Sequence, residues 1–188
     1  MTNFIESIRA EYLRYKTLAE AAIDQLSDDQ LSTPAPNGGN SIATIAWHVS
    51  GNLKSRFTDF LTTDGEKPWR QREEEFAARA VNRSELLAKW NEGWNVLIGT
   101  LATLTDKQLT KTVTIRQQPL LVHEALHRSL AHSSYHVGQI VYAAKAMRGK
   151  DWKYLSIPPG GSAVYNQAPT SEKPAAHQAA LTKRSTRK

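Results

Sequence analysis

Apolar residues recur every three or four positions along four long segments of the chain. This spacing is typical of helices that bury one face and expose the other. The four segments are residues 3–26, 41–61, 82–104 and 119–147. Residue types suited to a helix start stand at their beginnings, namely Thr2 or Asn3, Ser41, Asn82 and Pro119. The pattern predicts an all-α fold, an antiparallel four-helix bundle.

The segments between these helices differ in composition. Residues 32–41 are rich in Pro, Gly and Asn and indicate a loop, whereas residues 62–79 form a long polar connection between the second and third predicted helices. Long connections inside compact domains are often functional. Residues 111–118 alternate β-branched and polar side chains, which indicates either a short strand or an extended crossover.

The C-terminal part has two compositions. Residues 152–166 hold too many Pro and Gly residues for a helix, but their aromatic and aliphatic side chains predict an ordered arm. From residue 167 onward Ala, Thr, Ser, Lys and Arg predominate, which predicts little order. We therefore expect one domain over residues 1–166 and a basic tail over residues 167–188.

The charge of the chain lies mainly in this tail. The 188 residues carry a formal net charge of +6, and residues 171–188 hold five basic side chains against one acidic side chain. No aromatic residue interleaves these charges, as binding to single-stranded nucleic acid would require. We therefore expect a solvated tail and no nucleic-acid partner.

Two absences narrow the possible classes of protein. The chain has no cysteine, which excludes disulfides, thiolate metal ligands and a catalytic thiol of its own. It shows neither a basic N-terminal region followed by an apolar run nor an apolar segment of membrane-spanning length. We therefore expect a cytoplasmic protein with no membrane partner.

The fourth predicted helix carries four of the six histidines, in two pairs spaced four residues apart. At about 100° per residue each pair shares a face, and the two pairs lie on opposite faces. The first pair lies in the string HEALH beginning at His123, which matches the H-E-x-x-H pattern of zinc metalloproteases. A protease needs a third ligand, yet no Glu follows Glu124 before Glu172. We therefore favour a solvated polar face for this pair.

The second pair, His132 and His136, needs a third ligand from another helix. His48 is the remaining histidine before the tail, and it lies beside the apolar stripe of the second predicted helix. Three neutral imidazoles would form a metal site with at least one open coordination position. The same spacing also fits ordinary histidines of a core or its boundary, and spacing alone does not decide between these interpretations.

Three polar residues are predicted to border this site. Asn52 lies one turn after His48, Arg128 lies one turn before His132, and Gln139 lies two turns after His132. They could orient a ligand or bind a substrate carboxylate, or they could be surface polar residues and structural hydrogen-bonding groups. No Asp or Glu is placed on this face, which favours thiol chemistry over a protease-like hydrolase.

Two motifs resemble the DinB-like superfamily, also called the YfiT-like metal-dependent hydrolases. They are IAWHV at residues 45–49 and H-x-x-Y-H-x-G-Q-I at residues 132–140. The closing string LSIPPGGS at residues 155–162 is similar to a branch of small bacterial proteins of unassigned function. That branch more usually has Arg and Gln where Pro159 and Gly161 stand here. The resemblance covers nearly the whole chain before the tail.

The resemblance implies an antiparallel four-helix bundle, often dimeric, with a divalent metal held by three histidines. Those ligands fall on His48, His132 and His136. Characterised members of the superfamily include transferases and an isomerase that use low-molecular-weight thiols such as bacillithiol, mycothiol or glutathione. In these the metal stabilises the thiolate. Zn or Ni is the favoured ion, and Fe, Mn or Co also suits imidazole ligands.

Two functional hypotheses follow. The first is a metal-dependent enzyme, either a low-molecular-weight-thiol S-transferase or a small-molecule hydrolase, acting as a homodimer on a small-molecule substrate. The alternative is a non-catalytic metal-binding or stress-related helical protein. An open coordination position facing a pocket would favour the enzyme. A fourth protein ligand, or a C-terminal arm that covers the metal, would favour the alternative.

Overall fold

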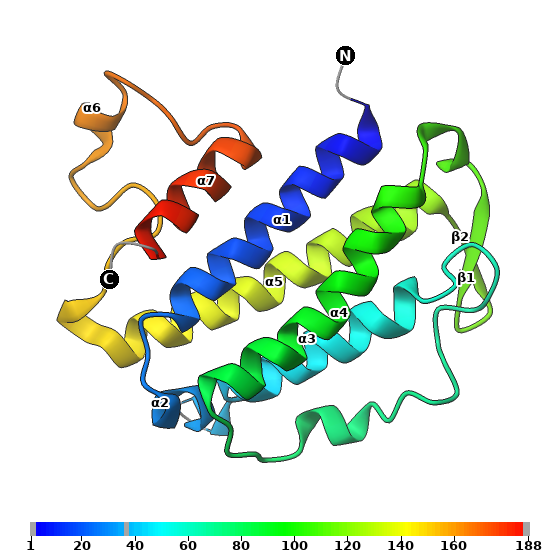
Figure 1. Ribbon diagram of the computed structural model, residues 1–188, viewed down its shortest axis with the longest axis horizontal. Coiled ribbons are helices and arrows are strands. Elements are labelled where there is room, and N and C mark those ends of the chain that lie inside the picture. Colours follow the sequence, from blue (N-terminus) through cyan, green and yellow to red (C-terminus); the bar gives the residue numbers. More distant parts are fainter. Residues whose placement is uncertain (1–2, 36–37, 186–188) are drawn as a thin grey trace.

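The computed structural model describes residues 3–35 and 38–185, and this part of the chain is mostly helical. Figure 1 shows the four longest helices side by side, with a small β-hairpin at one end. None of the described helices is long and apolar enough to cross a bilayer. In chain order the elements are α1 (Phe4–Ile23), α2 (Asp28–Ser32), α3 (Ile42–Phe57), η2 (Glu73–Phe76), α4 (Arg83–Thr103), η3 (Asp106–Gln108), β1 (Thr112–Ile115), β2 (Gln118–Leu121), α5 (Val122–Arg148), η4 (Gly149–Asp151), α6 (Ser162–Tyr165) and α7 (Pro174–Ser185).

Three of the predicted helix caps are confirmed. The Asn3 side chain accepts a hydrogen bond from the backbone N–H of Glu6 at 2.8 Å, and Asn82 accepts one from Glu85 at 2.9 Å. Both pairs form complete capping boxes, and Ser41 caps α3 with its side chain. These bonds satisfy amide groups that the first turn of a helix otherwise leaves without partners.

The apolar stripes of the long helices meet in one core. Tyr12 and Trp94 are fully buried, and the Tyr12 hydroxyl donates to the Leu126 carbonyl at 2.9 Å, which links α1 to α5. α3 and α4 are in close contact at Gly93, where a Cβ atom would lie 2.6 Å from the Cα atom of Ser50. The two helices carrying the candidate site, α3 and α5, are thus each fixed by a neighbouring helix.

Residues 111–118 contribute to a hairpin, and the predicted start of the last long helix at Pro119 is wrong. β1 and β2 pair antiparallel with Thr114 opposite Pro119, and α5 begins at Val122. Arg116 and Gln117 have φ values of 53° and 62°, as a two-residue hairpin turn requires. Pro119 is tolerated because both strands of a two-stranded sheet are edge strands, in which a residue without a backbone N–H need not break a hydrogen bond between the strands.

The predicted second helix is also shorter than expected. It ends at Phe57 rather than near Leu61, because Thr58 is extended and Asp59 has a φ of 49°. The backbone then turns into the long connection, which includes η2 and leads to α4. This change of direction brings the connection alongside the candidate site.

The prediction of little order from residue 167 onward is wrong for Pro174–Ser185, which form α7 beside α1 (Figure 1). Alanine has the highest helix propensity, and this segment is rich in it. Leu181 of α7 is 1% exposed, and the His177 ring N–H donates to the Leu155 carbonyl at 3.0 Å. Residues 186–188 of the predicted tail lie outside the described residues.

Candidate metal centre

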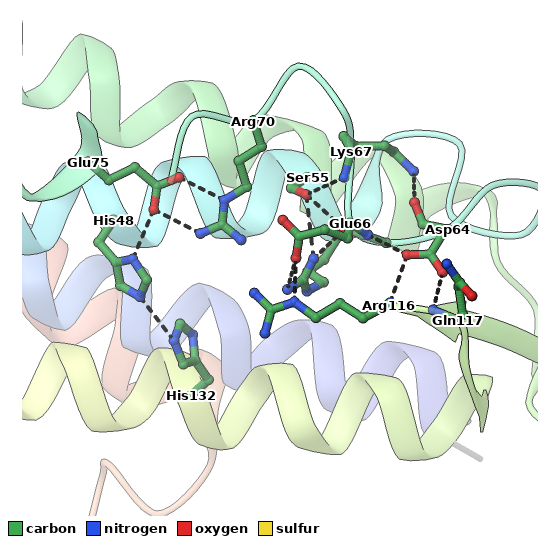
Figure 2. A network of polar contacts seen from close by, with 12 residues as sticks. His48, Ser55, Asp64, Glu66, Lys67, Arg70, Glu75, Arg116, Gln117 and His132 are labelled. Atoms are coloured by element: carbon green, nitrogen blue, oxygen red, sulfur yellow. Dashed lines mark hydrogen bonds and ion pairs between the residues drawn. The ribbon is translucent and has the colours of Figure 1, made fainter. Parts of the chain in front are cut away.

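Three histidines from two helices bring their Nε2 atoms together. His48 lies on α3, and His132 and His136 lie one turn apart on α5. His132 Nε2 is 3.3 Å from His48 Nε2 and 3.2 Å from His136 Nε2. Figure 2 shows His48 and His132 facing each other across the space between α3 and α5. The three residues that the sequence singled out as candidate ligands are therefore close together in space.

Hydrogen bonds at the opposite ring nitrogens fix two of the tautomers. His48 Nδ1–H donates to Glu75 Oε2 at 2.9 Å, and His136 Nδ1–H donates to Gln139 Oε1 at 2.8 Å. Both rings then direct a lone pair from Nε2 toward His132. His132 Nε2 can give a proton to at most one of these lone pairs. A cation between the three rings would satisfy all of them.

The spacing of the nitrogens also fits a small metal ion. Zn–N bonds of about 2.0–2.1 Å in tetrahedral geometry place neighbouring nitrogens about 3.3 Å apart. The two measured Nε2 distances, 3.2 and 3.3 Å, agree with this edge length. Two of the three edges therefore match those around a tetrahedral ion, and all three ligand atoms lie within 4.8 Å of one another.

Burial keeps two of the histidines in the neutral form that binds metals. Burial, followed by the nearby His136 and His48, lowers the pKa of His132 to about 4. Burial also lowers the pKa of His136, although its hydrogen bond to Gln139 partly opposes this shift. Both imidazoles are therefore in their neutral form, with one ring proton each, at neutral pH. Metal binding would then not have to compete with the second proton of an imidazolium.

A buried ion pair from the long connection supports His48. Glu75 of η2 accepts two hydrogen bonds from Arg70, at Oε1 and Oε2, both at 2.8 Å, besides the one from His48. The Arg70 side chain is 2% exposed and that of Glu75 is 9% exposed. Burial alone would raise the pKa of Glu75, but Arg70 and His48 hold it below the usual value. The sequence places no Asp or Glu on the helical face of the histidines, and the carboxylate that contacts His48 comes instead from η2 in the long connection.

A second set of contacts holds this connection against the hairpin (Figure 2). The Asp64 carboxylate accepts the backbone N–H groups of Glu66, Gln117 and Arg116 at 2.7–2.8 Å. These hydrogen bonds keep the pKa of Asp64 well below its usual range. Gly65 N–H also donates to the Thr114 carbonyl at 2.8 Å. The hairpin thereby fixes the segment that precedes Arg70 and Glu75.

A cavity of about 290 Å³ lies beside the histidines. His48 and His132 line it, together with Asn52 and Arg128, two of the three residues predicted to border the site. The third residue, Gln139, contacts His136 instead, and neither of these two residues lines the cavity. Among the residues that the structure describes, the lining includes no Asp, Glu or Cys.

The HEALH string does not form a metal site with a third ligand. The Glu124 carboxylate accepts the Leu121 backbone N–H at 2.7 Å and so caps α5. The His123 ring N–H donates to the Leu109 carbonyl at 3.0 Å, and the His127 ring packs edge-on against Phe4. Within the described residues, the ligating side chains that cluster closely are His48, His132 and His136 alone. The sequence favoured a solvated polar face for this pair; His127 is exposed, whereas His123 is half-buried.

Comparison with known proteins places the chain in a family. Residues 1–161 match the family described as protein of unknown function DUF1572. The chain belongs to the DUF1572 family. No curated protein matches it. A solved structure of a conserved protein from Enterococcus faecalis is similar, at 19% identity, covering 76% of this DUF1572 chain and 96% of that chain, with a TM-score of 0.56. This likeness shows a shared fold.

Proposed function

We propose that this DUF1572 protein is a metal-dependent enzyme with the antiparallel four-helix bundle of the DinB-like superfamily. His48, His132 and His136 would bind one divalent ion, with Zn²⁺ or Ni²⁺ as the first candidates. The observation that carries the proposal is the convergence of three Nε2 atoms, two of them on rings whose orientation is set by hydrogen bonds at Nδ1. Such supporting contacts are typical of real metal ligands.

The cavity supports an enzyme over a closed metal-binding protein. His48 and His132 both line it, so a small molecule could approach the ion from that side. Among the described residues no fourth ligating side chain joins the three histidines, and no residue of the C-terminal arm lines the cavity. An open position next to a pocket is the usual arrangement of catalytic rather than structural metal sites.

The side chains around the cavity favour thiol chemistry. A divalent ion with an open position supplies Lewis acidity and lowers the pKa of a thiol or water that binds it. The chain has no cysteine, so a thiol would arrive with the substrate or cosubstrate. The described lining offers no carboxylate as a general base, and Glu75 is committed to Arg70 and His48. We therefore place low-molecular-weight-thiol S-transfer first and small-molecule hydrolysis second.

Elemental analysis of the purified protein tests the metal site. We expect about one Zn or Ni per chain, lost in His48→Ala and His136→Ala and retained in the control His123→Ala, because three ligands are needed for tight binding. The loaded protein is then assayed with glutathione or bacillithiol and an electrophile. Absence of metal in the wild type after reloading, or equal metal in all variants, would contradict the proposal. The homodimer stays a prediction, which light scattering would test.

A further inference from the structure

The cavity beside the histidines is lined by an unusual concentration of arginines. Five guanidinium groups reach it from α3, the long connection, the hairpin and α5. They belong to Arg56, Arg70, Arg72, Arg116 and Arg128. Within the described part of the chain, no acidic side chain lines the cavity to balance them. The lining beside the candidate metal centre is therefore rich in positive charge, and most of that charge is paired with acidic residues outside the lining.

Four of these arginines have acidic partners that do not line the cavity, and one of these partners is the exposed Glu73, which pairs with Arg72 at 2.9 Å. Glu66 pairs with Arg56 at 3.1 Å and with Arg116 at 2.8 Å, and Glu75 pairs with Arg70. The pair with Glu66 uses the Nε atom of Arg116, so the terminal nitrogens of that guanidinium remain available. Figure 2 shows the Arg116 side chain reaching from the hairpin along α5 toward His132. A ligand in the cavity would meet the terminal nitrogens of Arg116, whereas the buried Arg70 is held by its two hydrogen bonds to Glu75.

Arg128 has no acidic partner among the described residues. It lies one turn before His132 on α5, and its side chain is exposed. A planar guanidinium with free donors binds a carboxylate or a phosphate through two parallel hydrogen bonds. Its position on the face of α5 that carries His132 places such a group next to the metal centre.

Apart from Asn52, Ser129 and the two histidines, the rest of the lining is apolar. Phe57 and Phe60 contribute aromatic rings from α3 and the turn after it, and Ile115 and Ala125 add aliphatic surface. An apolar wall with a few convergent charged groups is typical of small-molecule sites. The volume of about 290 Å³ limits the occupant to a compact molecule.

We infer that this cavity binds a small organic anion, whose carboxylate or phosphate group contacts Arg128 and Arg116 and whose short apolar body lies against Phe57 and Phe60. The inference rests on the proposed function, because it names the substrate class of the same site. The anionic group would hold the molecule so that its remaining atoms point toward the histidines.

Calorimetric titration of the full chain with succinate, inorganic phosphate and neutral succinamide tests the inference. We expect succinate or phosphate to bind in the millimolar range or tighter, and succinamide not to bind. Arg128→Gln should weaken anion binding by about tenfold, as expected for loss of hydrogen bonds to a charged group. Arg9→Gln is the matched control, since it removes the same charge from an exposed position of α1 outside the cavity.

The outcomes separate the two proposals. Tighter binding of phosphate than of succinate would identify a phosphate-bearing ligand, and the reverse a carboxylate. Equal affinities for Arg128→Gln and Arg9→Gln, or no binding of either anion, would overturn the inference even if the protein holds its metal. If the protein takes up no metal but binds the anion in an Arg128-dependent way, the inference is supported and the proposed function is contradicted. Circular dichroism checks that both variants remain folded.

Discussion

Replacing Glu75 by Gln should destabilise the protein and weaken its metal site together. The change removes a buried negative charge that accepts two hydrogen bonds from Arg70 and one from His48. Breaking a buried ion pair typically costs about 3–5 kcal/mol, because the remaining charge is left uncompensated. The glutamine keeps one oxygen acceptor, so we expect the free energy of unfolding to fall by about 3 kcal/mol, at the lower end of that range.

The matched control is Glu73→Gln, two residues earlier in η2. Glu73 is 87% exposed and pairs with Arg72 at the surface, where an ion pair contributes less than about 1 kcal/mol. Urea unfolding of the metal-free proteins measures both losses, and competition with a chelator measures metal affinity. We expect Glu75→Gln to lower that affinity about 10–100-fold, since it removes the group that orients His48. Equal unfolding free energies for the two variants would refute the assignment of a buried, supporting ion pair.

The effect of Glu75→Gln should depend on pH. Because Arg70 and His48 hold the pKa of Glu75 below its usual value in the folded protein, its charge stabilises the fold fully above the ordinary carboxyl pKa. That contribution is lost as the pH falls through the lower pKa of the folded state. The difference in stability between Glu75→Gln and the wild type should therefore shrink toward strongly acidic pH.

Two further predictions concern packing and protonation. Gly93→Ala should destabilise the protein by about 1–3 kcal/mol in urea unfolding, because the added Cβ would collide with the backbone of Ser50. Gly99→Ala on the same helix has open space for its Cβ and should stabilise the protein by about 0.5–1 kcal/mol. Destabilisation by both substitutions would contradict the close approach of α3 and α4. The metal-free protein should lose stability as the pH falls from about 6.5 to about 4, because the unfolded His132 then binds a proton that the folded one does not. Urea unfolding across this range should show a smaller loss for His132→Gln, and identical profiles would contradict the burial of that ring.

The helical part of the candidate site could be predicted from the sequence because helical spacing fixes which residues share a face. His132 and His136 are four residues apart, and His48 lies beside the stripe of buried residues on α3. The same reasoning placed Asn52 and Arg128 at the edge of the site, and both line the cavity. Periodicity within each helix predicts which residues share a face, but it does not show that they bind a metal or a substrate.

The limits of this reasoning appear where a local signal competes with tertiary structure. Pro119 is compatible with the first turn of a helix, but pairing with Thr114 places it in a strand. The Ala-rich segment that forms α7 has helix propensity, but its basic and polar side chains are also typical of a disordered tail. Burial of Leu181 in the core depends on tertiary structure, and composition does not reveal it.

The hydrogen bond from His48 to Glu75 could not be predicted from the sequence. Glu75 lies 27 residues from His48 in a run of three glutamates without helical or strand periodicity, so nothing local distinguishes it from its exposed neighbours. Its position depends on the hairpin, because Asp64 and Gly65 hold the connection to the backbone of Thr114 and the residues after it. Disrupting the hairpin turn should therefore loosen the metal centre although no hairpin residue is a proposed ligand. The helices supply the three candidate ligands, and the connection, held by the hairpin, supplies the carboxylate that contacts His48.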